Sequence, residues 1–112
     1  MRNIYSLTHV LEEEGIKVIS AYNGRQAITQ LEAHGEVDVV LMDMMMPELN
    51  GYETTRLIRQ RPHWKLLPII AVTAQAMQGD REKCMDAGAS DFLSKPVKTE
   101  ELLSLLKVWM YR

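Results

Sequence analysis

A chain of 112 residues with 46% apolar and 25% charged residues has the composition of one globular domain. Its net charge of -2 offers no electrostatic basis for binding nucleic acid or an anionic membrane surface. Its apolar runs are also far shorter than the roughly 20 residues of a membrane span. We therefore expect one cytoplasmic domain over residues 1–112 that by itself binds neither nucleic acid nor membranes.

The chain is predicted to open on a helix. Apolar residues recur at helical spacing within residues 4–11, and Gly15 then ends the run. A short apolar strand is predicted over residues 16–20. Asn23 can cap the next helix, with Gln26 three residues later in a near capping box.

The middle of the chain alternates buried strands with a helix. Residues 37–42 are apolar except for Asp38, which is typical of a strand inside a parallel sheet. Pro47 and the following turn separate it from a helix predicted over residues 52–60. Residues 68–73 predict a second strand of the same buried type.

The last third predicts two further helices around a strand. A helix over residues 80–87 should end at Gly88, where a left-handed backbone is least costly, and residues 90–94 predict a strand. Thr99 can cap the final helix. The core-facing positions of that helix are Leu102, Leu105, Leu106 and Trp109.

Strands and helices that alternate at these lengths predict a flavodoxin-like doubly wound α/β fold, with a parallel sheet covered on both faces. A sheet of this kind usually starts with a strand, whereas this chain enters directly into a helix. We therefore expect an N-terminally truncated fold whose first strand is missing.

Three polar side chains fall at the carboxyl ends of successive predicted strands: Asp43, Thr73 and Lys95. Parallel strands bring these ends to one edge of the sheet, where ligands of such folds collect. A carboxylate, a hydroxyl and an ammonium suit covalent phosphorylation, in which the carboxylate attacks phosphorus and the other two groups stabilise the phosphoryl oxygens. A single carboxylate is nevertheless a poor Mg²⁺ site.

Taken jointly, these residues resemble the receiver domains of two-component response regulators over the whole chain. The motifs are the apolar strand ending in Asp43 with Pro47 and Gly51 beyond it, and the segments Thr73-Ala74, Ala87-Gly88-Ala89 and Lys95-Pro96. Asp43 and Thr73 lie 30 residues apart, and Thr73 and Lys95 lie 22 apart. The joint spacing is a much stronger signal than any one motif.

The resemblance assigns roles to individual residues. Asp43 would be the phosphoacceptor, taking phosphate from a phosphohistidine on a histidine kinase or a histidine phosphotransfer domain. Thr73 would move toward the aspartyl phosphate, and Lys95 would pair with it. Phe92 matches the aromatic position whose inward or outward rotamer reports phosphorylation. Met45 matches the position that lends its backbone carbonyl to Mg²⁺.

One feature of the family has no counterpart. Receivers hold Mg²⁺ with an acidic pair at the end of the first strand, and that pair would fall upstream of Met1. We therefore expect Mg²⁺ binding to be weak or absent in this chain. Arg2-Asn3 resembles the sequence after that pair in hybrid histidine kinases, so Met1 is expected to be internal to a longer protein or an artificial boundary. The Lys95-Pro96 bond is expected to be cis.

The absence of the first strand should affect the stability of the sheet. In receivers the first strand lies between the second and the third, so its removal would leave a gap of about 10 Å with unpaired backbone groups on both sides. The chain should then be a fragment, poorly stable, or completed by self-association or by another chain that supplies a strand.

Three functions remain open at this stage. The first is a phosphoacceptor signalling domain, not an enzyme with a separate substrate, that signals through the fourth helix, last strand and last helix. The second is a phosphorylation-incompetent interaction module that keeps this surface. The third is a flavodoxin-like cofactor binder, which is weak because no glycine-rich or hydroxyl-rich phosphate loop follows any strand.

Overall fold

The computed structural model describes residues 9–44, 50–73 and 78–110. Its sheet consists of three parallel strands in the order β1-β2-β3, namely β1 (Val40–Asp43), β2 (Ile69–Thr73) and β3 (Asp91–Ser94). The helices are α2 (Gly24–Ala33), α3 (Gly51–Arg59), the 3-10 helix η1 (Pro62–Trp64), α4 (Gln78–Ala87) and α5 (Thr99–Met110). The prediction of a doubly wound α/β fold is confirmed.

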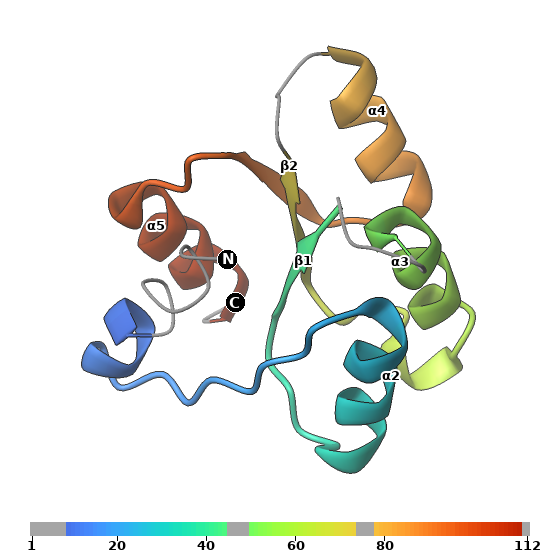
Figure 1. The fold of residues 1–112 in the computed structure, drawn as a ribbon, viewed down its shortest axis with the longest axis horizontal. Coiled ribbons are helices and arrows are strands. Elements are labelled where there is room, and N and C mark those ends of the chain that lie inside the picture. Colours follow the sequence, from blue (N-terminus) through green and yellow to red (C-terminus); the bar gives the residue numbers. More distant parts are fainter. Residues whose placement is uncertain (1–8, 45–49, 74–77, 111–112) are drawn as a thin grey trace.

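Helices cover both faces of this sheet (Figure 1). Helices α2, α3 and α4 pack on one face, whereas α5 and the helical residues 9–13 pack on the other. Strand β2 is buried throughout and alternates between the two cores: Ile69 and Ala71 join the core under α2, α3 and α4, and Ile70 joins the core under α5. The central strand is thus fixed by both cores.

Local hydrogen bonds explain where the helices begin and end. Asn23 caps α2 by accepting from the Gln26 backbone at 2.8 Å, as predicted, and Gln26 accepts in return from the backbone of Tyr22. Gly88 ends α4 with a φ of 114°, and the bonds from Gly88 to Met85 and from the next residue to Cys84 form a Schellman motif. The predicted stop at Gly88 is confirmed.

The predicted cap at Thr99 is wrong by one residue. Thr99 is the first residue of α5, and the carbonyl of Lys98 accepts the bond from the backbone N–H of Leu102 at 3.0 Å. Glu100 and Glu101 lie in the first turn of α5, where negative charge is favourable.

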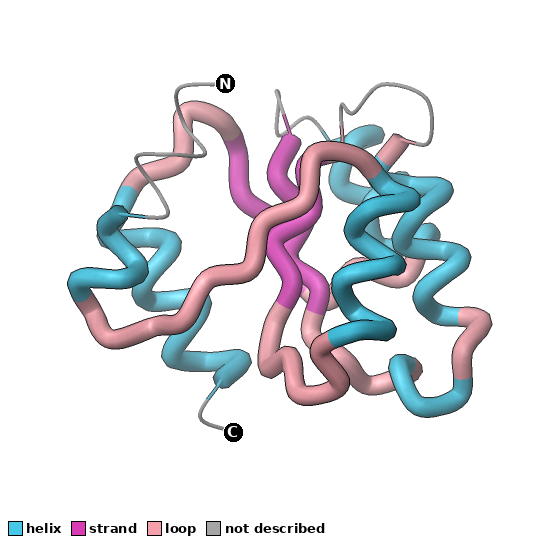
Figure 2. Tube along the Cα trace, turned by 60° about the horizontal axis from the view of Figure 1, so that its bottom comes forward, coloured by secondary structure: helices cyan, strands magenta, loops and turns pink. Residues whose placement is uncertain are grey.

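The predicted strand over residues 16–20 is not formed. Ile16 and Val18 pack against the core under α5 while Lys17 and Ile19 are exposed, so the alternation expected of a strand is present. A strand also requires a neighbour to share its backbone hydrogen bonds, and none of the pairing among the described residues involves this segment. It runs as a loop across the sheet (Figure 2), which leaves β1 as an edge of the described sheet.

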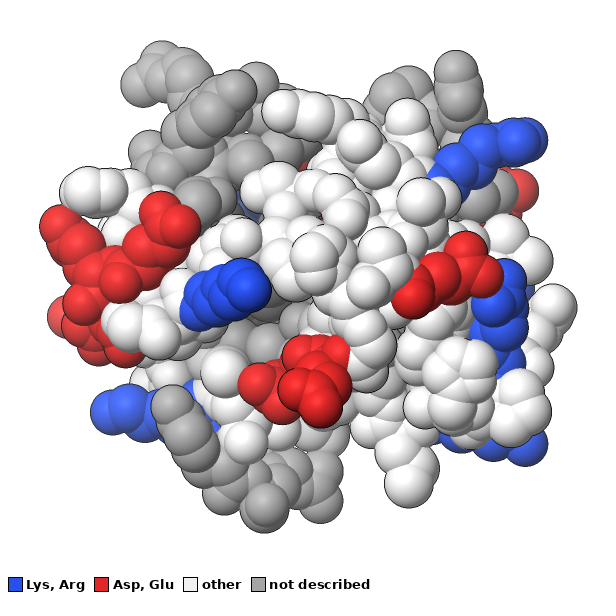
Figure 3. All heavy atoms as spheres, turned by 90° about the horizontal axis from the view of Figure 1, so that it is seen from below, with Lys and Arg blue, Asp and Glu red and all other residues white. Residues whose placement is uncertain are grey.

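On the face that Figure 3 shows, acidic side chains gather at the left, and elsewhere acidic and basic side chains lie among uncharged ones. In the part of the chain that the structure describes, every helix is too short or too polar to cross a membrane.

Candidate functional site

Two of the three predicted site residues are in direct contact. Asp43 is the last residue of β1, and Lys95 follows β3 immediately. The Lys95 Nζ lies 3.1 Å from Asp43 Oδ2, and their side chains are 27% and 18% exposed respectively. The ammonium therefore lies beside the carboxylate at a place that solvent can still reach.

Thr73 ends the strand between them. Strand register pairs Asp43 with Val72 and Thr73 with Ser94. All three predicted residues therefore lie at the carboxyl ends of the strands, on the same side of the sheet. The Thr73 carbonyl accepts a 2.7 Å hydrogen bond from the backbone N–H of Lys95. Thr73 itself is 4% exposed. The central strand thus carries a buried threonine between the carboxylate and the lysine.

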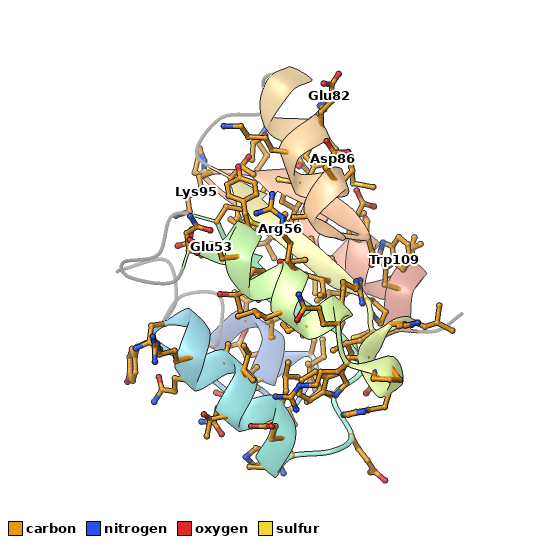
Figure 4. The ribbon with its side chains drawn as sticks, turned by 90° about the vertical axis from the view of Figure 1, so that its right-hand side faces the viewer. Glu53, Arg56, Glu82, Asp86, Lys95 and Trp109 are labelled. Atoms are coloured by element: carbon orange, nitrogen blue, oxygen red, sulfur yellow. The ribbon has the colours of Figure 1, made fainter. Side chains whose placement is uncertain are left out.

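The start of α3 packs directly against the backbone of Asp43. A Cβ on Gly51 would lie 2.5 Å from the Asp43 carbonyl oxygen and 2.6 Å from Met44 Cα, so only glycine allows this approach. Asn50 caps α3 by accepting from the backbone N–H of Glu53 at 2.9 Å. Figure 4 shows Lys95 and Glu53 at the same end of the molecule.

The sequence predicts a turn in this segment and gives no sign that it packs against Asp43. The pattern of Asn50 with Glu53 three residues later is a helix-start signature that could have located the beginning of α3. The close approach of Gly51 to Asp43 depends on tertiary packing, which no local pattern records.

Phe92 lies on β3, three residues before Lys95, and is half-buried against the core under α2, α3 and α4. The guanidinium of Arg81 on α4 lies 4.8 Å from the centroid of its ring. The backbone of Phe92 pairs with Ala71, and the Phe92 N–H donates to the side chain of Asp91 at 2.8 Å. Sequence analysis did not single out Arg81, because an exposed arginine on a polar helix carries no distinguishing signal.

The Lys95-Pro96 peptide bond is cis, as predicted.

The described donors do not by themselves fit a divalent cation. No group of three or more His, Cys, Asp or Glu side chains among the described residues could hold a metal ion. Asp43 supplies one carboxylate, and Lys95 already contacts one of its oxygens. The predicted ligand Met45 lies outside the described residues.

Comparison with known proteins agrees with this geometry. The family model of the response regulator receiver domain matches residues 2–107, and the chain belongs to that family. It is 39% identical to the signal transduction histidine-protein kinase BarA of Escherichia coli over 104 residues, which are 93% of this chain and 11% of that kinase. It is 38% identical to protein PilH of Pseudomonas aeruginosa over 103 residues, which are 92% of this chain and 84% of PilH. The chain thus spans about a tenth of the kinases that it matches.

Solved structures give the same result. The crystal structure of the receiver domain of a sensor histidine kinase from Pseudomonas aeruginosa has a magnesium ion coordinated in its active site cleft. It matches with a TM-score of 0.90 at 40% identity over 99% of this chain and 90% of that one. The signal receiver domain of a histidine kinase from Syntrophus aciditrophicus matches with a TM-score of 0.87 at 31% identity over 98% and 83% of the two chains.

Proposed function

We propose that this chain is a phosphoacceptor in a two-component phosphorelay and that Asp43 receives the phosphoryl group. The observation that supports this most strongly is the 3.1 Å contact between Lys95 Nζ and Asp43 Oδ2. It lies at the carboxyl ends of the strands, where Thr73 also lies. A carboxylate held beside a cation at this edge can accept a phosphoryl group without a general base, because it is already ionised.

The reaction proposed is transfer from a phosphohistidine on a histidine kinase or a histidine phosphotransfer domain. An oxygen of Asp43 attacks the phosphorus, the phosphorus–nitrogen bond breaks, and the imidazole keeps the electron pair and takes up a proton. Lys95 offsets the charge on the phosphoryl oxygens, and the Thr73 hydroxyl donates a hydrogen bond to one of them. The chain thus catalyses its own modification and has no separate substrate.

The signal is proposed to leave through the surface of α4, β3 and α5. On this surface Phe92 changes its orientation when Thr73 moves toward the phosphoryl group. We further propose that the chain works in the cytoplasm, as part of a hybrid histidine kinase. Self-association through the gap in the sheet left by the missing first strand remains an expectation from the sequence.

Magnesium binding by this chain alone is proposed to be weak. The donors described at the site amount to one carboxylate that a lysine already contacts. This observation also favours a second candidate function, in which the chain is an interaction module that keeps the α4, β3 and α5 surface but cannot be phosphorylated.

Intact mass after incubation with acetyl phosphate and Mg²⁺ separates the two functions. The phosphoacceptor predicts one added phosphoryl group on the wild type, none on Asp43→Asn, and full labelling of the control Asp38→Asn, because Asp38 is exposed in the loop before β1. Lys95→Met should label more slowly than the wild type. Absence of labelling at every Mg²⁺ concentration would favour the interaction module instead.

A further inference from the structure

A cation on α4 lies over the ring of Phe92, on the face of the sheet where α2, α3 and α4 pack. Arg81 is one helical turn before Cys84, which is fully buried in the core of this face, so the two residues share the side of α4 that faces the sheet. The Arg81 guanidinium lies 4.8 Å from the centroid of the Phe92 ring, within the range of a cation–π interaction.

The backbone of Phe92 is fixed independently of this contact. It pairs with Ala71 of β2, and its N–H donates to Asp91, whose other carboxylate oxygen accepts from the Trp109 indole N–H at 3.2 Å. Strand pairing and the link to α5 therefore hold the main chain, and the freedom left to Phe92 is the torsion of its side chain. A contact with the ring acts on that torsion.

Among the described residues, the ring of Phe92 is the one charged or aromatic contact of the Arg81 guanidinium. The Arg81 side chain is exposed, and it has no carboxylate within ion-pair distance among the described residues. The ring of Phe92 lies between this exposed cation and the core, so the contact favours an orientation in which one ring face is turned outward to α4.

We propose that Arg81 is a positioning residue that holds Phe92 in this outward orientation and so opposes phosphorylation of Asp43. This inference rests on the proposed function, in which the orientation of Phe92 is coupled to the phosphoryl group. Because such coupling is reciprocal, an interaction that stabilises the outward ring must disfavour the phosphorylated form by the same factor. A partly exposed cation–π contact corresponds to a factor of about two to five.

The chain contains a single phenylalanine, so incorporation of 3-fluorophenylalanine reports on Phe92 alone. Without any phosphodonor, Arg81→Gln should shift the ¹⁹F resonance, and Arg81→Lys should keep most of the wild-type position because it retains a cation. The matched control is Arg56→Gln, which removes an exposed arginine of α3 that lies over no ring among the described residues. An unchanged resonance in Arg81→Gln would overturn the contact.

The second measurement tests the consequence. With limiting acetyl phosphate, Arg81→Gln should raise the phosphorylated fraction relative to the unphosphorylated one by about two- to fivefold. Arg81→Lys and Arg56→Gln should stay near the wild type, and the thermal midpoint of Arg81→Gln should fall only slightly, because the lost contact stabilises the unphosphorylated form. Equal or reduced labelling of Arg81→Gln would refute the proposed role. Failure of the wild type to label would instead refute the proposed function, while the fluorine measurement would still test the contact between Arg81 and Phe92.

Discussion

Arg59 at the end of α3 joins this helix to the nearby residue Trp64 and to the distant segment that contains Gly88 and Ser90. Its guanidinium donates to the carbonyl of Gly88 at 2.8 Å, to the carbonyl of Trp64 at 2.7 Å and to the hydroxyl of Ser90 at 3.3 Å. Ser90 also accepts from the backbone N–H of Ile69 at 3.1 Å. Burial lowers the pKa of the Arg59 guanidinium, which nevertheless stays protonated at any physiological pH.

Replacing this side chain with methionine should destabilise the fold. Hydrogen bonds from a charged group contribute about 1.5–3 kcal/mol each. The two short bonds of Arg59 to carbonyls, counted at the low end because the group is only partly buried, give about 3 kcal/mol for Arg59→Met. The bond to Ser90 is longer and adds little. Methionine keeps much of the apolar stem, so packing contributes less to the loss.

The matched control is Arg61→Met, two residues further on. Arg61 pairs with Glu32 at 2.8 Å, but the side chains are 44% and 49% exposed, and its guanidinium lies 5.1 Å from the ring of Trp64. These contacts together contribute about 1 kcal/mol. Urea unfolding followed by far-ultraviolet circular dichroism should therefore place Arg59→Met about 2 kcal/mol below Arg61→Met. Equal losses in the two variants would refute the conclusion that the hydrogen bonds of Arg59 to Gly88 and Trp64 stabilise the fold.

Other predictions concern the start of α3. Gly51→Ala places a Cβ against the Asp43 carbonyl and should cost about 1–3 kcal/mol and reduce labelling by acetyl phosphate. The control Gly35→Ala meets nothing within 4 Å, so unfolding and labelling should both match the wild type. Asn50→Ala and Asn23→Ala each remove a cap and should cost about 1 kcal/mol in thermal unfolding. If the Asn50 cap positions the start of α3 against Asp43, Asn50→Ala should also slow labelling by acetyl phosphate, whereas Asn23→Ala should not. Equal labelling rates in the two variants would exclude a role of the Asn50 cap at the site.

Three strands and the contact between Asp43 and Lys95 could be predicted because the apolar runs that mark the strands are local signals. The uninterrupted apolar residues 39–42 before Asp43 predict a strand inside a parallel sheet, and parallel strands bring their carboxyl ends to the same side of the sheet. The contact between Asp43 and Lys95 follows from that geometry. The end of α4 at Gly88 could also be predicted from a local signal, because a left-handed backbone conformation favours glycine.

What the sequence could not supply depends on partners in space. Residues 16–20 alternate as a strand should, yet strand formation requires a neighbour, and the structure describes none there. Gly51, Arg59 and Arg81 act through contacts between different elements of the fold, so their roles became visible only when the fold placed those elements side by side.

The central claim is that Asp43 accepts a phosphoryl group. The most direct test is intact mass spectrometry of the wild type and Asp43→Asn after incubation with acetyl phosphate across a range of Mg²⁺ concentrations. The account predicts one phosphoryl adduct on the wild type, a requirement for high Mg²⁺, and no adduct on Asp43→Asn. An adduct that persists in Asp43→Asn, or a wild type that never labels, would contradict it.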